Sequence, residues 1–203
     1  MKERGNLFIL SGPSGVGKGT VRKELFKKNN NNLIYSISAT TREPRFKEKD
    51  GVDYFFLSKN KFEEMINNGE FLEYAQYVDN YYGTPKSWID KIRDEGKDVF
   101  VEIEVKGAMQ VRSKVSDATF IFLLPPDLEQ LKNRLILRGS ESDEVINERL
   151  KTARQEIKMM TNYDYAVVND KVELAVKKIQ MIINTSRMKA SRVAAEYIQI
   201  LEE

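Results

Sequence analysis

Apolar residues along this chain form short runs that alternate with stretches of helical spacing. The apolar-rich runs 7–10, 99–105 and 118–124 are typical of strands in a parallel sheet that is covered on both faces. In the stretches 59–68 and 106–114, apolar positions recur every three or four residues, which predicts amphipathic helices. Because strands alternate with helices, the pattern predicts an α/β fold with a mainly parallel sheet core flanked by helices.

Residues 36–84 depart from this alternation, because strand-like runs dominate there and helical spacing is scarce. The expected strands are 33–38, 53–57 and 71–80, followed by a turn at 80–85. Branched and aromatic residues in these runs favour strands. The change in composition predicts a small sheet-rich insertion in the core fold. At the other end of the chain, residues 171–201 have the spacing of one long amphipathic helix.

A glycine-rich segment stands between the first apolar run and the first helical stretch. It consists of Gly12, Pro13, Ser14, Gly15, Val16, Gly17, Lys18, Gly19 and Thr20. A glycine, four residues and Gly-Lys is the pattern of a loop whose backbone N–H groups surround phosphate oxygens. The following helix directs its N-terminus at the same anion. An ordinary strand–helix turn is the alternative, but the flanking strand and helix favour a nucleoside triphosphate site.

The loop departs from its usual pattern at one position. Gly19 stands where most such loops have the Ser or Thr hydroxyl that ligates Mg²⁺, and Thr20 comes one position late. We therefore expect the metal to be held mainly through water and nucleotide oxygens.

Composition excludes several classes of function. The 203 residues include 33 Lys and Arg against 31 Asp and Glu, and this balance argues against a nucleic-acid polymer as the partner. The absence of cysteine excludes disulfides and thiolate metal sites, and the absence of histidine excludes imidazole catalysis. No apolar window approaches about 20 residues and no signal-peptide pattern begins the chain. We expect a cytoplasmic protein that does not bind membranes.

Two arginines share a loop with three hydroxyl residues. Arg42 and Arg45 follow Ser38, Thr40 and Thr41. An arginine presents a fixed fork of donors that matches an anion's oxygens, so two at this spacing can clamp one phosphate. Tyr54 and Tyr82 would add phenolic donors. On spacing alone, solvated arginines and aromatic core residues remain the alternatives.

Two carboxylates lie at the end of a predicted strand. Glu102 and Glu104 are two residues apart, which would place them on the same face of that strand. Acids are tolerable at the carboxyl end of a parallel sheet, where the ligand crevice opens. There they would order Mg²⁺ through water or accept donors from a substrate. A salt-bridged position at the sheet edge is the alternative.

Three further arginines surround a polar break at residues 138–143. Arg134 and Arg138 are one helical turn apart, and Arg149 belongs to the start of the next helix. If the break forms a flap, these arginines could neutralise charge on a phosphoryl group in transit. Taken alone, helical surface arginines are usually only solvated.

At this point the chain resembles the guanylate kinase family, in its compact bacterial form. The resemblance rests on the segments GPSGVGKGT, SATTREPR, DGVDYFFL, GEFLEYAQYVDNYYGTP, VFVEIEVKGA, FIFLLPP, RLILRG and VVND. The glycine-rich loop is shared with many unrelated nucleotide enzymes, whereas the second and third segments, together with NYYGT, are much more specific.

The resemblance implies one domain over residues 1–203, with a GMP-binding insertion at 36–84 and a lid at 125–160. Guanine would be held by Ser38, Glu73, Thr84 and Glu104. The GMP phosphate would be held by Arg42, Arg45, Tyr54 and Tyr82. ATP would contact the loop around Lys18, Arg134, Arg138 and Arg149, with Asn169 near adenine.

The reaction implied is ATP + GMP = ADP + GDP, with Mg²⁺ as cofactor, Glu102 as a water-mediated metal ligand, and dGMP as a further substrate. Lys18, Arg42, Arg138 and Arg149 would be the catalytic cations. Family members more often have Ser or Asp where this chain has Gly19, Glu102 and Glu104, so the metal shell stays open. The alternatives are a kinase for another nucleoside monophosphate and a non-catalytic binding module. The intact loop lysine and glycines speak against the module.

Overall fold

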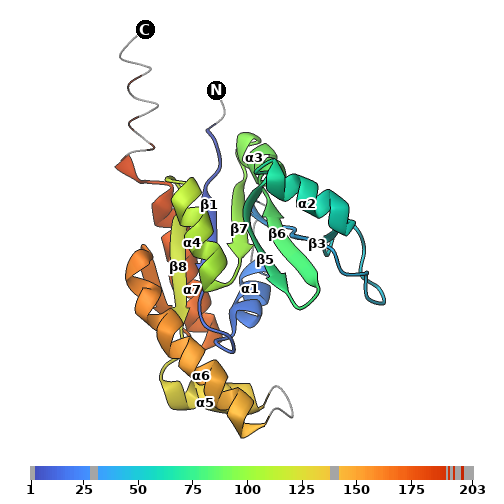
Figure 1. The fold of residues 1–203 in the computed structure, drawn as a ribbon. Coiled ribbons are helices and arrows are strands. Elements are labelled where there is room, and N and C mark those ends of the chain that lie inside the picture. The colour runs from blue at the N-terminus through green and yellow to red at the C-terminus, as the bar shows by residue number, and fades with distance from the viewer. Residues whose placement is uncertain are drawn as a thin grey trace. The chain divides into compact units, whose positions relative to one another are not determined.

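The computed structural model describes residues 3–27, 32–137 and 142–190, together with residues 192, 194 and 198. The chain divides into two compact units (Figure 1). Unit 1 contains Met1–Ile9 and Asn30–Ala118, and unit 2 contains Leu10–Asn29 and Thr119–Glu203. Arg138 and the start of the polar break, residues 139–141, lie outside the described residues.

A parallel sheet forms from the apolar runs. Its strands are β1 (Leu7–Ser11), β2 (Leu33–Tyr35), β7 (Asp98–Glu102), β8 (Thr119–Leu124) and β9 (Tyr165–Val168). Their order is β2-β7-β1-β8-β9, and both β2–β7 in unit 1 and β8–β9 in unit 2 are parallel pairs. Every residue of β1 is buried, as expected of a strand in the middle of such a sheet. The α/β fold class predicted from the sequence is confirmed.

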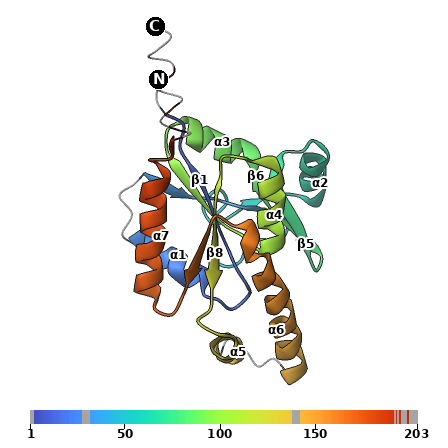
Figure 2. The same cartoon turned by 90° about the vertical axis from the view of Figure 1, so that its left-hand side faces the viewer.

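The helices of unit 2 pack in two pairs. They are α1 (Lys18–Lys27), α5 (Leu128–Ile136), α6 (Asp143–Lys158), the 3₁₀ turn η1 (Met159–Asn162) and α7 (Val172–Ser186). Helix α1 lies beside α7 (Figure 2), and α5 packs on α6 through Leu131, Leu135 and Ala153. In the described part of the chain, no helix is long and apolar enough to cross a membrane.

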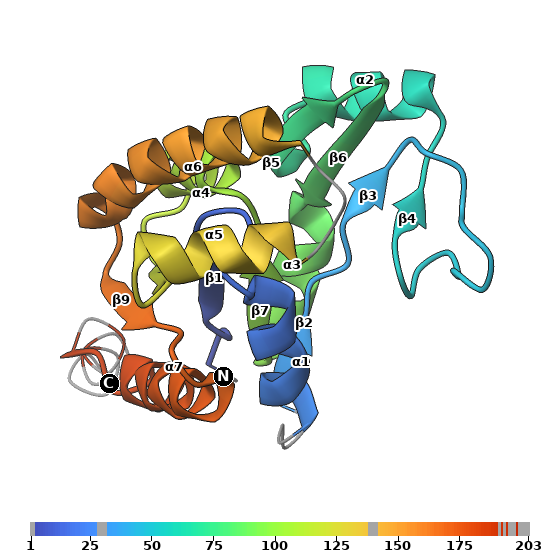
Figure 3. The ribbon, with the colours of Figure 1, turned by 90° about the horizontal axis from the view of Figure 1, so that it is seen from below.

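Unit 1 carries a second sheet, which is the sheet-rich region that the sequence predicts. Its strands are β3 (Ala39–Thr40), β4 (Phe55–Phe56), β5 (Phe71–Tyr77) and β6 (Asn80–Pro85), in the order β4-β3-β6-β5. Unit 1 also contains α2 (Lys59–Asn67), α3 (Lys86–Asp94) and α4 (Val105–Lys114). Helix α2 covers this sheet (Figure 3). Phe62 of α2 stacks on Phe71 and Tyr81, with ring centroids 4.3 and 5.3 Å away.

Several predicted boundaries are wrong. Residues 80–85 form strand β6 rather than a turn, because the hairpin reverses earlier, where Val78 adopts a φ of 54°. The run 33–38 is a strand only to Tyr35. Strand β7 ends at Glu102, since Glu104 already caps helix α4. Helix α7 ends at Ser186 instead of continuing to residue 201.

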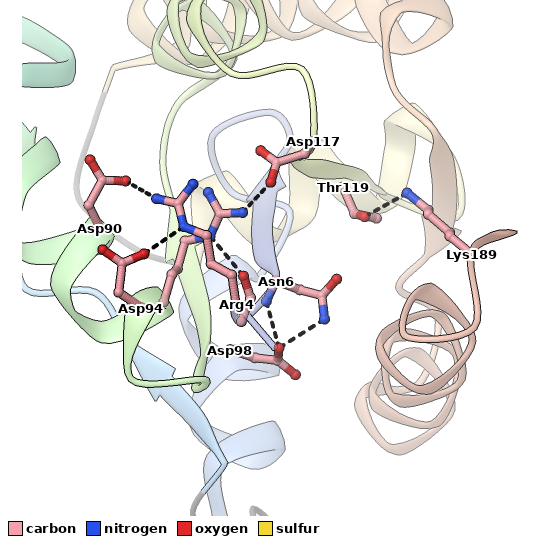
Figure 4. Close-up of polar contacts among 10 residues, drawn as sticks. Arg4, Asn6, Asp90, Asp94, Asp98, Asp117, Thr119 and Lys189 are labelled. Carbon is pink, nitrogen blue, oxygen red and sulfur yellow. Dashed lines mark hydrogen bonds and ion pairs between the residues drawn. The ribbon is translucent and has the colours of Figure 1, made fainter. Parts of the chain in front are cut away.

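Polar contacts tie the N-terminal segment of unit 1 to α3 and β7 (Figure 4). Arg4 contacts Asp90 and Asp94 at 2.5 and 2.9 Å. Asn6 donates twice to Asp98, from its backbone N–H at 2.7 Å and from its side chain at 2.9 Å. Because Asn6 and Asp98 are both buried, these bonds satisfy polar groups that would otherwise be costly inside unit 1.

We predict that Phe62→Ala destabilises the protein by about 3–5 kcal/mol, because it removes a fully buried ring and leaves a cavity. The matched control is Phe46→Ala, whose side chain is 90% exposed and whose loss should change stability by less than about 0.5 kcal/mol. Urea unfolding followed by circular dichroism measures both. Equal effects of the two substitutions would contradict the packing described.

Candidate active site

The glycine-rich segment of unit 2 lies between β1 and α1, as predicted, and two of its glycines are required by geometry. Gly12 has a φ of 150°, and a Cβ there would lie 2.3 Å from the carbonyl oxygen of Leu123. Gly17 has a φ of 97°, and a Cβ there would lie 2.7 Å from the side-chain nitrogen of Asn169. Any other residue would strain the backbone or displace a neighbour. The loop can therefore pass close to the end of β8 and to Asn169.

Side chains from distant parts of unit 2 fix the orientation of the loop peptides. The carbonyl of Val16 accepts from Asn169 Nδ2 at 2.9 Å and from Arg134 at 3.2 Å. Arg134 also donates to the carbonyl of Asn169 at 2.9 Å. In a trans peptide the N–H points away from the C=O, so the N–H of Gly17 is turned away from Asn169 and Arg134. This N–H can therefore donate a hydrogen bond to an anion bound in the loop.

Two cationic groups contact the loop directly. Lys18 donates to the carbonyls of Gly12 and Pro13 at 2.5 and 3.2 Å, which holds its ammonium group against the loop. Arg149 of α6 donates to the hydroxyl of Ser14 at 2.6 Å. The structure thus brings Lys18, Arg134, Arg149 and Asn169, all predicted as ATP contacts, to one loop at the N-terminus of α1. This concentration of positive charge suits a polyphosphate.

A cavity of about 600 Å³ lies in unit 1, between the second sheet and the start of α4. Its walls include the predicted guanine residues Ser38, Glu73 and Glu104 and the predicted phosphate residues Tyr54 and Tyr82. Glu73 is only 7% exposed, and its Oε1 accepts from the Thr84 hydroxyl at 2.6 Å. Burial raises the pKa of Glu73, although the Thr84 hydrogen bond acts in the opposite direction. A pocket that holds one buried acid is suited to a ligand with adjacent hydrogen-bond donors.

Arg42 lies over the ring of Tyr54, with its guanidinium carbon 4.9 Å from the ring centroid. It binds both carboxylate oxygens of Glu48, at 2.7 and 2.8 Å. This bidentate contact raises the pKa of Arg42. The hydrogen bond from Arg42, helped by the backbone N–H of Arg45, lowers the pKa of Glu48 to about 2. The Arg45 residue itself is exposed, so the structure presents Arg42 as the better ordered of the two predicted phosphate arginines.

The two acids that the sequence places on one strand face occupy different elements. Glu102 is the last residue of β7, and Glu104 is the N-cap residue of α4. Both nevertheless line the cavity. In the described part of the chain, no three Asp, Glu, His or Cys residues come together as a metal site. The carboxylates of Glu102 and Glu104 could order the waters of a Mg²⁺ ion that arrives with nucleotide oxygens.

Sequence reasoning missed Glu48 and Gly107. Glu48 follows Arg42 by six positions in a charged loop, and no periodic pattern marks it as a partner of that arginine. Gly107 lines the cavity beside the Glu73 carboxylate, but a glycine within a helical stretch carries no signal of its own. Thr20, by contrast, is exposed, and the metal role that the sequence left open for it stays open.

Comparisons with known proteins give consistent matches over nearly the whole chain. The sequence profile of the family described as guanylate kinase matches residues 4–186. A guanylate kinase of Enterococcus faecalis is 59% identical over 203 residues, which are all of both chains. One of Oceanobacillus iheyensis is 56% identical over all of this chain and 98% of its own. The crystal structure of guanylate kinase from Anaplasma phagocytophilum superimposes with a TM-score of 0.72 at 32% identity, covering 94% of this chain and 90% of that one.

We predict that Arg42→Met raises the pKa of Glu48 from about 2 towards its ordinary value of 4.5, because the main cause of the lowering is removed. The lowered pKa means that the Arg42–Glu48 pair stabilises the folded state above about pH 4.5. This contribution is lost as the pH falls through about 2. Carboxyl-detected NMR titration measures the midpoint. The control Arg45→Met retains the backbone N–H contact, so most of the lowering should persist; an unchanged pKa in Arg42→Met would contradict the pairing.

Proposed function

The chain belongs to the guanylate kinase family and catalyses phosphoryl transfer from ATP to GMP, and we propose that the cavity of unit 1 binds GMP while the loop of unit 2 binds ATP. The observation that carries this assignment is the buried carboxylate of Glu73, which lines a cavity of about 600 Å³ and accepts a hydrogen bond from Thr84. Guanine presents adjacent donors at N1–H and at its 2-amino group, and one carboxylate accepts both side by side.

The same pair would reject adenine. Adenine has an acceptor at N1 and no 2-amino group, so a bound AMP would leave the buried carboxylate facing a lone pair. Sites built around a buried hydrogen bond discriminate by about 10⁴-fold against analogues that lack it. Ser38 is placed at the cavity wall, where its hydroxyl would donate to guanine O6 or N7, and Glu104 at the same wall would accept further donors of the base.

The phosphate of GMP would bind at Arg42, Tyr54 and Tyr82. The contacts of Arg42 to Glu43 and Glu48 use three of the five guanidinium N–H groups. Two N–H groups would then serve the substrate phosphate, so Glu48 would orient the guanidinium without having to leave. Arg45 would complete the clamp from its exposed position.

ATP would place its outer phosphates in the loop around Lys18, with Arg149 and Arg134 beside them and Asn169 towards adenine. An oxygen of the GMP phosphate attacks the γ-phosphorus, the bond to the β,γ-bridging oxygen breaks, and ADP leaves with that oxygen. A phosphate oxygen is a competent nucleophile near neutral pH, so the step needs no protein base, which agrees with a chain that lacks histidine. Lys18, Arg42, Arg149 and Arg138 would neutralise the transferring charge.

Mg²⁺ bound to ATP would supply further charge neutralisation, with Glu102 ordering its water shell. The departure at Gly19 removes a loop hydroxyl but leaves this arrangement intact. We include dGMP as a substrate, since the residues assigned to GMP are assigned to its base and its phosphate, and none is assigned to the 2′-hydroxyl. A cytoplasmic location would give the enzyme access to both nucleotides.

We predict that Lys18→Met lowers kcat at least tenfold while the fold survives, because a charge that contacts the outer phosphates is lost. Circular dichroism and a coupled assay of ADP release measure the two effects. Lys23→Met, an exposed change of the same charge in the same helix, is the control and should retain activity. More than a tenth of wild-type kcat in Lys18→Met would remove Lys18 from the mechanism.

We predict that Glu73→Gln lowers kcat/KM for GMP by about two orders of magnitude, while the KM for ATP changes little, because an amide cannot accept both guanine donors. Wild-type enzyme should use GMP and reject AMP in the same assay. Glu64→Gln, an exposed acid of α2 paired with Lys61, is the control. Equal losses for ATP and GMP would place the base pocket elsewhere, and no turnover of GMP by the wild type would favour the binding-module alternative.

A further inference from the structure

Strand β5 is an edge strand of the second sheet, since β6 is its one neighbour in the order β4-β3-β6-β5. The backbone groups on its other side need partners. At Tyr74 the partner is the side-chain amide of Gln110 in α4. It accepts from the Tyr74 N–H at 3.2 Å and donates to the Tyr74 carbonyl at 3.0 Å. One glutamine thus makes the two bonds that a neighbouring strand residue would make.

A second residue of α4 extends this edge. Lys114, one turn after Gln110, donates to the carbonyl of Phe71 at 3.0 Å. The register between β5 and β6 shifts between Phe71 and Glu73, and a bulge of this kind re-aims the side chain that follows it. Gln110 and Lys114 therefore hold β5 on both sides of the irregularity that precedes Glu73.

A third residue of α4 limits the carboxylate itself. Gly107 lies three residues before Gln110, and a Cβ at this position would lie 2.7 Å from Glu73 Oε2 and 3.3 Å from its carboxyl carbon. Real Cβ atoms do not approach so closely, so the carboxylate would have to move. The other oxygen of Glu73 is held by Thr84 at 2.6 Å. The carboxylate thus lies between a hydrogen bond on one side and a glycine on the other.

We propose that helix α4 is a specificity element of this enzyme, in which Gly107 and Gln110 act as positioning residues for the Glu73 carboxylate. The inference rests on the proposed role of Glu73 in guanine recognition. A binding constellation must be held within about 0.5 Å to be productive, and acceptance of two adjacent donors by one carboxylate is sensitive to such shifts. Displacement of the carboxylate weakens its bond to the 2-amino group, so discrimination against a base that lacks this group falls.

The test is the ratio of kcat/KM for GMP to that for inosine monophosphate, which retains N1–H and O6 but lacks the 2-amino group. Gln110→Met keeps the length of the side chain and removes both bonds to Tyr74. Gly107→Ala adds one methyl group, and alanine by itself favours a helix more than glycine does. We expect each variant to lower the ratio about tenfold, the loss that corresponds to one ordinary hydrogen bond, mainly through KM for GMP.

Ser113→Ala is the matched control, because the Ser113 hydroxyl donates to the backbone carbonyl of Gln110 within α4 rather than to β5. It should leave the ratio unchanged. A purely structural role of α4 would lower the active fraction equally for both nucleotides, so an unchanged ratio in both Gln110→Met and Gly107→Ala overturns the proposal, whatever happens to kcat or to the melting temperature.

Glu73→Gln separates this proposal from the one on which it rests. If Glu73→Gln collapses the ratio but the two α4 variants do not, the positioning role alone is wrong. If Glu73→Gln leaves the ratio unchanged, the assignment of the guanine site itself is wrong, and the positioning role is lost with it. If all three substitutions lower the ratio and Ser113→Ala does not, α4 sets the specificity.

Discussion

The hydrogen bond between Thr84 and the buried carboxylate of Glu73 is the contact on which the proposed guanine site of unit 1 depends. An ionised acid in a nearly closed position is costly unless donors surround it. Here burial raises the pKa of Glu73 and the nearby charge of Glu104 acts in the same direction, whereas Thr84 and the charge of Lys114 oppose them. In the free protein, the cost of burying the Glu73 carboxylate is therefore only partly offset. A ligand that brings two donors relieves this cost, and a ligand without them increases it.

The loop of unit 2 follows the opposite logic. There the backbone carbonyl oxygens already accept hydrogen bonds from side chains. The Val16 carbonyl accepts from Asn169 and Arg134. The carbonyls of Gly12 and Pro13 accept from Lys18. Carbonyl oxygens that pointed into the loop would repel a phosphate. Turning them towards side chains leaves the N–H groups to face the anion, and it fixes them before the ligand arrives, so that little is lost in reorganisation. Glycine is needed because the chain must pass Leu123 and Asn169 at close range.

Much of the fold follows from local pattern, and the parts that do not are set by long-range contacts. The buried run of β1, the loop after it and the sheet-rich region of unit 1 could be predicted because each depends on residues adjacent in sequence. Strand β6 could not, since Tyr81 and Gly83 resemble a turn until β5 and β3 pair with them on either side. The glycine-rich loop was found from spacing alone, whereas Glu73 entered through a family resemblance, because an acid in an aromatic strand is equally a capping or surface residue. Glu48 and Gly107 were missed, since their importance lies in what they touch.

The chemistry of phosphoryl transfer explains why cationic side chains, rather than a general base, dominate the proposed phosphate sites. Phosphoryl transfer to a phosphate oxygen requires no proton abstraction by the protein, so a chain without histidine loses nothing by its absence. The requirement is instead for fixed cations and for substrate in one orientation. A guanidinium serves this purpose only if its plane is held, and Glu48 holds that of Arg42 through two oxygens while Tyr54 packs against its face. Because the pKa of Glu48 is about 2, this support stays ionised near neutral pH. In the proposed phosphate site, Glu48 would therefore act by holding the Arg42 guanidinium in one orientation, which would compensate for the charge that it partly cancels.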